Sequence, residues 1–197
     1  VPFAVESALS GVQKELKDNQ ELWYTRMFKV PANWKGQKVL LHFGAVDWKA
    51  DVWVNDVKIG QHTGGFTPFC FDITAALASG DNKLVVKVWD PTSNGEQPRG
   101  KQAYNPGGIF YTPVSGIWQT VWLEPVAEHH IANVKTTPDI DKSLVKVEVA
   151  TNAAVSGDLV EVKLFDGANL VATGKALGGE AVELIVKNQK LWSPESP

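Results

Sequence analysis

The stretch that decides the fold covers residues 39–74 and reads VLLHFGAVDWKADVWVNDVKIGQHTGGFTPFCFDIT. In three parts of it an apolar residue recurs at every second position: Val39, Leu41, Phe43 and Ala45, then Ala50, Val52 and Val54, then Phe69, Phe71 and Ile73. Because side chains alternate between the two faces of a strand, this period predicts three strands with one buried face each. Asn55 and Asp56 tolerate positive φ and follow the second run, so we expect a two-residue hairpin turn there.

Similar alternation predicts strands on both sides of this stretch, at residues 22–30 before it and at residues 84–88 and 117–123 after it. Thr74 is a suitable helix N-cap, and residues 75–80, AALASG, are expected to make one or two helical turns. This is the only convincing helix in the pattern. The first part of the chain is therefore predicted to be an all-β sandwich.

A long loop is expected at residues 91–116, which lack periodicity and are rich in proline and glycine. A loop of this length in a compact domain is usually functional or disordered. It carries polar and aromatic residues suited to hydrogen bonding and stacking with a sugar, namely Arg99, Lys101, Gln102, Tyr104, Asn105, Phe110 and Tyr111. The alternative is a loop that only covers an edge of the sandwich.

A second module is predicted after a boundary near residues 124–126. Residues 129–140, HHIANVKTTPDI, are expected to form its first strand, and three more alternating strands follow at residues 145–149, 160–164 and 182–186. Short strands separated by turns rich in Gly and Asp are typical of an immunoglobulin-like sandwich. We therefore predict two domains, residues 1–126 and residues 127–197.

Composition excludes several classes of function. The chain has 197 residues and a formal net charge of −3, so it has no basic field for nucleic acid. No apolar run approaches the roughly 18 residues that span a membrane. The single cysteine, Cys70, lies between Phe69 and Phe71 and is interpreted as a buried structural thiol. Eight tryptophans are many for this length and suggest carbohydrate stacking, although core packing explains each one equally well.

No pattern for catalysis, metal binding or cofactor binding is found. His129 and His130 are neighbours on an expected strand, so their side chains point to opposite faces and do not share a metal ion. There is no Gly-x-Ser-x-Gly motif and no phosphate-binding glycine loop. Isolated carboxylates are interpreted as solvated surface groups or as groups hydrogen-bonded to turns, rather than as a catalytic pair, here Glu6, Asp47, Asp51 and Asp72. We expect no catalytic residue, no metal site and no cofactor in this chain.

Three motifs in order carry a resemblance to a known family. Residues 26–52 read RMFKVPANWKGQKVLLHFGAVDWKADV, residues 53–74 read WVNDVKIGQHTGGFTPFCFDIT, and residues 114–124 read VSGIWQTVWLE. This pattern resembles the N-terminal β-sandwich of family 2 glycoside hydrolases, the β-galactosidase and β-glucuronidase group. The resemblance implies a galactose-binding-like jelly-roll sugar-binding domain, then an immunoglobulin-like β-sandwich, then a (β/α)₈ barrel with both catalytic glutamates. Since strands and helices do not alternate here, we expect that barrel to lie outside this chain.

The resemblance also implies an indirect contribution to a sugar site. In the galactosidase branch, the first sandwich lends an asparagine from a Glu-Asn-Pro-x-Gly loop, whose counterpart here is Ser7. It also lends an aspartate before the Ser-Gly-Ile strand, where this chain has Phe110 and Tyr111. Both departures weigh against a strict β-galactosidase, so the resemblance does not determine which sugar the parent enzyme acts on. The predicted substrate-binding residues are Ser7, Arg99, Lys101, Gln102, Tyr104 and Tyr111.

These observations favour the non-catalytic N-terminal part of a family 2 glycoside hydrolase. Its expected partners are a β-linked carbohydrate and the C-terminal catalytic barrel of the same parent chain, with no nucleic acid and no membrane. The alternative is a free-standing carbohydrate-binding module with an exposed platform drawn from Trp23, Trp53, Trp89, Trp118 and Trp122. A purely structural role fits residues 127–197 better than the first half.

The two ends of the chain complete the expectations. The abrupt start at VPFAVESALSGV suggests that a leader or strand precedes it. The ending LWSPESP resembles the family's turn before the last strand of its second domain, so the second sandwich is expected to be incomplete. Family analogy favours a periplasmic or extracellular location.

Overall fold

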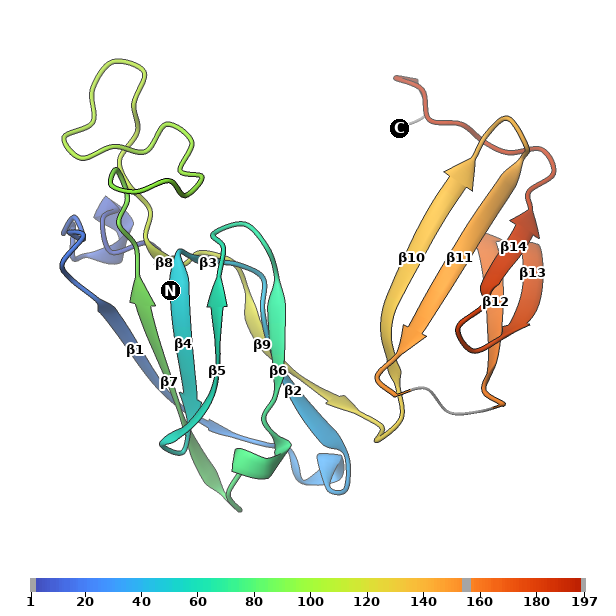
Figure 1. The fold of residues 1–197 in the computed structure, drawn as a ribbon, viewed down its shortest axis with the longest axis horizontal. Helices are drawn as coiled ribbons and strands as arrows, with labels where there is room; N and C mark the ends of the chain where they lie inside the picture. Colours follow the sequence, from blue (N-terminus) through green and yellow to red (C-terminus); the bar gives the residue numbers. More distant parts are fainter. Residues whose placement is uncertain (1–2, 154–156, 196–197) are drawn as a thin grey trace. The chain divides into compact units, whose positions relative to one another are not determined.

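The computed structural model describes residues 3–153 and 157–195, in which strands are joined by turns and by three short 3₁₀ turns. The predicted all-β fold is confirmed. The chain divides into two compact units, Val1–Val126 and Ala127–Pro197, which we call the first unit and the second unit (Figure 1). The predicted features that fall on residues 1–2 and 196–197 lie outside the described residues.

The first unit is a sandwich of two antiparallel sheets. The larger sheet has the order β1-β7-β4-β5, with β1 (Leu22–Lys29), β7 (Asp81–Trp89), β4 (Lys49–Val54) and β5 (Val57–Thr63). The smaller sheet has the order β6-β2-β9, with β6 (Phe69–Asp72), β2 (Lys38–Phe43) and β9 (Val121–Val126). A short ladder pairs β3 (Val46–Asp47) with β8 (Gly116–Ile117).

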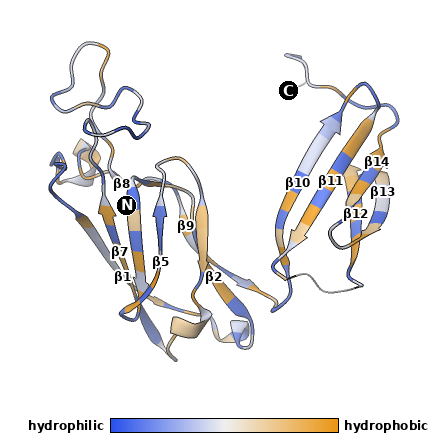
Figure 2. Ribbon diagram, viewed as in Figure 1, coloured by the Kyte–Doolittle hydropathy of each residue, from blue (hydrophilic) through white to orange (hydrophobic). Residues whose placement is uncertain are grey.

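One apolar core joins the two sheets of the first unit. Phe43 of β2, Val52 of β4 and Val86 of β7 are fully buried within it. Polar residues alternate with these apolar ones, and Figure 2 shows the resulting hydrophobic and hydrophilic bands along the strands. Burying such a side chain stabilises the fold by about 1.5–3 kcal/mol. The predicted core face of residues 39–54 is therefore confirmed.

The predicted turn at Asn55 and Asp56 is also confirmed. Both residues have positive φ, 50° and 65°, and the flanking Val54 and Val57 are paired across β4 and β5. The side-chain amide nitrogen of Asn55 donates to the carbonyl oxygen of Ala76 at 2.8 Å, and its side-chain oxygen accepts from the backbone amide of Lys83 at 2.9 Å. The turn residue therefore also anchors the chain before β7.

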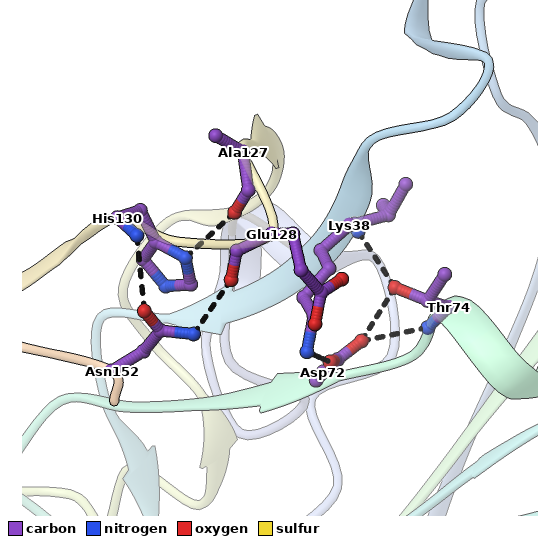
Figure 3. Close-up of polar contacts among 8 residues, drawn as sticks. Lys38, Asp72, Thr74, Ala127, Glu128, His130 and Asn152 are labelled. Carbon is purple, nitrogen blue, oxygen red and sulfur yellow. Dashed lines mark hydrogen bonds and ion pairs between the residues drawn. The ribbon is translucent and has the colours of Figure 1, made fainter. Parts of the chain in front are cut away.

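The helix predicted after Thr74 is wrong, because only the 3₁₀ turn η3 (Thr74–Ala76) forms. The Thr74 hydroxyl does not cap a helix: it accepts from the Val39 amide at 2.8 Å and donates to Asp72, which also pairs with Lys38 at 3.5 Å (Figure 3). The fully buried Asn82 accepts from the Ala78 amide at 2.8 Å. These side-chain bonds replace the hydrogen bonds of a helix.

The interpretation of Cys70 as a buried thiol is wrong. Phe69 and Phe71 pack against the core, so the alternation of β6 turns Cys70 outward, and its side chain is exposed.

The second unit consists of two smaller sheets. One has the order β10-β11-β14, with β10 (Ile131–Asp139), β11 (Leu144–Thr151) and β14 (Ala181–Ile185). The other is a hairpin of β12 (Leu159–Asp166) and β13 (Asn169–Leu177). Near its start, the His130 amide donates to the Asn152 side chain at 3.0 Å, and Asn152 donates to the carbonyl oxygen of Glu128 at 2.8 Å (Figure 3).

Strand β13 is missing from the sequence prediction, which has three strands after β10, whereas residues 140–153 and 157–195 of the structure contain four. Its centre, Ala172-Thr173-Gly174, is too small to give an apolar period. A Cβ at Gly174 would lie 2.8 Å from the side chains of Leu184 and Val182. The close approach of β14 therefore requires the small residue that conceals the strand.

Candidate functional site

The candidate site lies at the end of the first unit where β7 ends and the β3–β8 ladder begins. The segment between β7 and β8, residues 90–115, extends past these strands (Figure 1). It is braced by its own hydrogen bonds, since the Tyr111 amide donates to the carbonyl oxygen of Lys101 at 2.9 Å and the Ala103 amide donates to that of Tyr111 at 3.2 Å. We call this segment the long loop.

Two of the predicted sugar-binding residues of the long loop hold the loop itself. The side-chain oxygen of Gln102 accepts from the Val114 amide at 2.5 Å. The Arg99 guanidinium donates to the carbonyl oxygen of Ser93. Lys101 is exposed beside them. An isolated β-bridge pairs the backbones of Gln102 and Tyr111, which brings the backbone of Lys101 next to Tyr111.

The two predicted tyrosines have different environments. The Tyr104 hydroxyl donates to the carbonyl oxygen of Pro91 at 3.3 Å, and the ammonium of Lys17 lies 4.7 Å from the ring centre. Burial raises the pKa of Tyr104 above its ordinary value. Tyr111 is 64% exposed. Tyr104 is therefore part of the loop's support, whereas Tyr111 offers a free side chain.

The hydroxyl and the carbonyl oxygen of Ser7 make their hydrogen bonds within the N-terminal segment and not with the long loop. It precedes the 3₁₀ turn η1 (Ala8–Ser10), and its hydroxyl donates to the carbonyl oxygen of Ala4 at 2.9 Å. Its carbonyl oxygen accepts from the Ser10 hydroxyl at 2.7 Å. The contact between this segment and the long loop comes from the neighbouring residue, Glu6, whose carboxylate accepts from the Ser115 amide at 3.4 Å.

Sequence analysis missed a group of buried acids at the base of the long loop. Glu6, Asp47 and Asp90 are only 8%, 5% and 3% exposed, so the interpretation of Glu6 and Asp47 as solvated groups is wrong. We call these three residues the carboxyl cluster. Asp51 is also buried, but it pairs with Lys58 at 2.7 Å and is not part of the cluster.

The cluster has unusual electrostatics. Burial, followed by the negative charges of Asp90 and Glu6, raises the pKa of Asp47 from 3.8 to about 7, against the effect of a hydrogen bond from Gln102. Burial also raises the pKa of Glu6, with a smaller contribution from Asp90. Among the described residues, no basic side chain is a main cause of the pKa shift of either group. A buried carboxyl without a cation favours its protonated form.

Glycines allow the close packing around the cluster. A Cβ at Gly65 would lie 2.4 Å from a carboxylate oxygen of Asp47. Gly116 has φ 92°, and a Cβ there would lie 2.1 Å from the Tyr24 hydroxyl. The Gly64-Gly65 pair and the Ser115-Gly116 pair are thus the sequence signals that mark this crowded place.

An apolar groove of the first unit is a different feature. It has a volume of about 650 Å³ and is mainly apolar, lined by residues of β1, β2, β7, β8 and β9 that include Tyr24, Phe28, Leu41, Val86 and Leu123. None of the predicted sugar-binding residues lines it.

The tryptophans proposed as a sugar platform already contact other parts of the chain through their rings or their indole N–H groups. Trp23 and Trp53 stack on each other at 5.8 Å, and the ammonium groups of Lys87 and Lys58 lie near their rings. Trp122 is 44% exposed and has one face on the His42 ring. The indole N–H groups of the other two are bonded, from Trp89 to the carbonyl oxygen of Asp18 and from Trp118 to that of Gly65.

The described residues contain no group of three or more His, Cys, Asp or Glu side chains arranged to hold a metal ion. They also contain no helix long and apolar enough to cross a membrane.

Comparison with known proteins identifies relatives across most of the chain. A family model described as "Glycosyl hydrolases family 2, sugar binding domain" matches residues 9–123. A β-galactosidase of Thermoanaerobacter pseudethanolicus is 30% identical over 187 residues, which are 89% of this chain and 24% of that protein. A β-glucuronidase of Paenibacillus borealis is 28% identical over 212 residues, which are 98% of this chain and 35% of that protein.

Solved structures agree with these matches. A β-glucuronidase from an uncultured Clostridium sp. has a TM-score of 0.73 at 30% identity and covers 100% of this chain, which spans 34% of it. The β-glucuronidase of Ruminococcus gnavus in complex with D-glucaro-d-lactam has a TM-score of 0.72 at 28% identity, over 89% of this chain and 31% of that one. The chain thus spans about a quarter to a third of the length of these relatives.

Proposed function

Because the chain belongs to glycosyl hydrolase family 2 through its sugar-binding domain, we propose that it is the non-catalytic N-terminal part of a larger enzyme that hydrolyses β-glycosides. Its relatives are β-galactosidases and β-glucuronidases several times its length. A retaining glycosidase requires two carboxylates about 5 Å apart. We assign that pair to a barrel outside this chain, and we assign to this chain the support of the barrel and one wall of its sugar pocket.

The exposed tip of the long loop is the observation that carries this proposal. Ile109, Phe110 and Tyr111 are 66%, 51% and 64% exposed, on a loop whose base is held by hydrogen bonds. A loop held by hydrogen bonds and carrying an apolar tip is suited to burial against another domain, since exposed apolar patches mark interaction sites. Lys101 beside Tyr111 supplies a hydrogen-bond donor for a sugar hydroxyl.

The test is kinetic and uses the full-length gene product. We expect Tyr111→Ala and Lys101→Ala each to lower kcat/KM by about tenfold, a typical effect of losing one stacking or hydrogen-bonding contact in the transition state. Aryl β-galactosides and aryl β-glucuronides are both assayed, because the relatives act on either class by name.

The matched control is Val57→Ala, which changes a 53% exposed residue beside the β4–β5 turn, at the other end of the first unit (Figure 1). We expect this change to leave the kinetics as they are. Unchanged kinetics for both loop variants, with their folding intact, would remove the long loop from the sugar pocket.

The second candidate is a free-standing carbohydrate-binding module, favoured by the 56% exposure of Trp23 and the 44% exposure of Trp122. Calorimetric titration of this 197-residue chain with galactose, glucuronic acid, mannose and β-linked oligosaccharides distinguishes the two. Binding by this chain alone, lost in Trp122→Ala, supports the module. Binding only by the full-length product supports the wall of a shared pocket.

A further inference from the structure

The carboxyl cluster connects both ends of the long loop to the sandwich. One carboxylate oxygen of Asp90 accepts from the Thr92 amide at 2.8 Å, at the start of the loop. The other accepts from the Ser115 hydroxyl at 2.7 Å, at its end. The Ser115 amide in turn donates to Glu6 at 3.4 Å. Asp90 therefore closes the loop, and Glu6 attaches the N-terminal segment to the same point.

Asp47 connects the middle of the loop to the cluster. It lies on β3 opposite Gly116 of β8, and its carboxylate receives a hydrogen bond from Gln102. The same carboxylate packs against Gly65, where there is no space for a side chain. Four segments of the first unit thus converge on three acids.

This convergence leaves negative charge without a neutralising partner. The second carboxylate oxygen of Glu6 is buried and has no hydrogen-bond partner. Like charges in a poorly solvated site repel each other, so loss of the cluster's proton disfavours the closed arrangement of the acids.

We propose that Glu6, Asp47 and Asp90 form a proton-dependent latch, which holds the long loop and the N-terminal segment on the sandwich when protonated and releases them when the proton is lost. The latch is a property of this chain and does not depend on the proposed function.

The other ionisable groups around the cluster do not replace this proton. Tyr24 faces it from β1, with its hydroxyl oxygen accepting from the Ile117 amide at 3.2 Å. Burial raises the pKa of Tyr24, as it does that of Tyr104 on the loop, so both phenols stay neutral near pH 7. The charges of Lys17 and Asp18 act on Tyr104 in opposite directions.

The direction of the pH effect follows from the raised pKa. A carboxyl with a pKa of about 7 in the closed state and an ordinary pKa in the open state binds its proton more tightly when closed. Opening is therefore suppressed at low pH, becomes easier as the pH rises toward 7, and levels off above that value. Between pH 6 and pH 8 the equilibrium constant for opening rises about tenfold.

Hydrogen–deuterium exchange of this chain at pH 6, 7 and 8, corrected for the intrinsic rate, tests the latch. We expect protection of the Thr92, Ser115 and Ile117 amides to fall about tenfold over this range, while protection in β4 stays constant. Asp47→Asn keeps the shape of the protonated acid and should remove most of the pH dependence. The matched control is Asp51→Asn, which changes the buried acid that pairs with Lys58. This variant should keep the pH dependence of protection.

A second measurement needs no variant. Carboxyl carbon NMR of the chain labelled at aspartate should show one aspartate that titrates near pH 7. Protection that does not change with pH, or aspartates that all titrate below pH 5, would overturn the proposal. If Asp47→Asn does not fold, the titration of the wild-type chain decides the question alone.

Discussion

The two units of this chain bury their side chains very differently. In the first unit, residues of both sheets, such as Phe43, Val52 and Val86, have no exposed surface. Among the described residues of the second unit, only Val147, Val182 and Leu184 are buried, and β10 is exposed along almost its whole length. Small units bury a smaller fraction of their surface and are less stable for that reason.

Buried polar groups follow the same division. All those found among the described residues lie in the first unit, and the carboxyl cluster is among them. Removing a carboxylate from water requires a rigid surrounding that compensates its cost. The carboxyl cluster therefore depends on the extensive apolar core of the first unit. The second unit has no core of that size among its described residues.

Truncating the two cores gives the largest expected effect and tests this difference. Phe43→Ala removes a fully buried ring that stacks on Phe69 at 4.7 Å, and we expect it to destabilise the first unit by about 3–5 kcal/mol. Leu184→Ala should cost about 2–3 kcal/mol in the second unit, because its thin core collapses more easily around the change. Urea unfolding measures both.

Tryptophan fluorescence separates the two units in this experiment. Seven of the eight tryptophans lie in residues 1–126, and the remaining one is Trp192. Fluorescence therefore follows the first unit, while far-ultraviolet circular dichroism follows both. If Leu184→Ala moves the fluorescence transition as far as Phe43→Ala does, the units unfold together and the comparison fails.

Crowding at the carboxyl cluster gives the next largest effect. Gly65→Ala would place a Cβ 2.4 Å from the Asp47 carboxylate, and we expect a loss of about 1–3 kcal/mol in the first unit. Gly107→Ala is the control, because a Cβ there has nothing within 4 Å and the glycine does not have a positive φ. Equal thermal unfolding midpoints for Gly65→Ala and Gly107→Ala would mean that the packing around Asp47 has room for a Cβ at residue 65.

The sequence predicts well where a local period and the final fold agree. The core face of residues 39–54 follows from alternation alone, and the turn at Asn55 and Asp56 follows from their tolerance of positive φ. The helix after Thr74 fails because Asn82, four residues beyond Ala78, holds that backbone in another shape. Contacts of this kind cannot be read from a local pattern.

The candidate site was less predictable than the fold. Polar residues in a long irregular loop drew attention to Gln102 and Tyr111, which the structure joins. The carboxyl cluster could not be found in this way, because Glu6, Asp47 and Asp90 come from distant parts of the chain. Each has an unremarkable sequence environment, and only the fold removes all three from water. The predicted sugar contacts themselves stay predictions until the kinetic test.

The smallest effect is expected at the one close histidine–aspartate pair described in the second unit. The His129 imidazole lies 2.6 Å from the Asp158 carboxylate, and the two side chains are 37% and 25% exposed. In a double-mutant cycle with His129→Ala and Asp158→Ala, we expect a coupling free energy of about 0.2–1 kcal/mol, which 1 M salt should reduce.

The pair of Asp51 and Lys58 provides the comparison in the first unit. Asp51 is buried, and it also has the ammonium of Lys87 at 3.5 Å. Removing Asp51 should cost more than removing Asp158, since it takes a buried carboxylate from Lys58 and leaves Lys87 with the carboxylate of Glu21, at 3.0 Å. If the coupling free energy of His129 with Asp158 is larger than that of Lys58 with Asp51, the start of the second unit is more rigid than its small core implies.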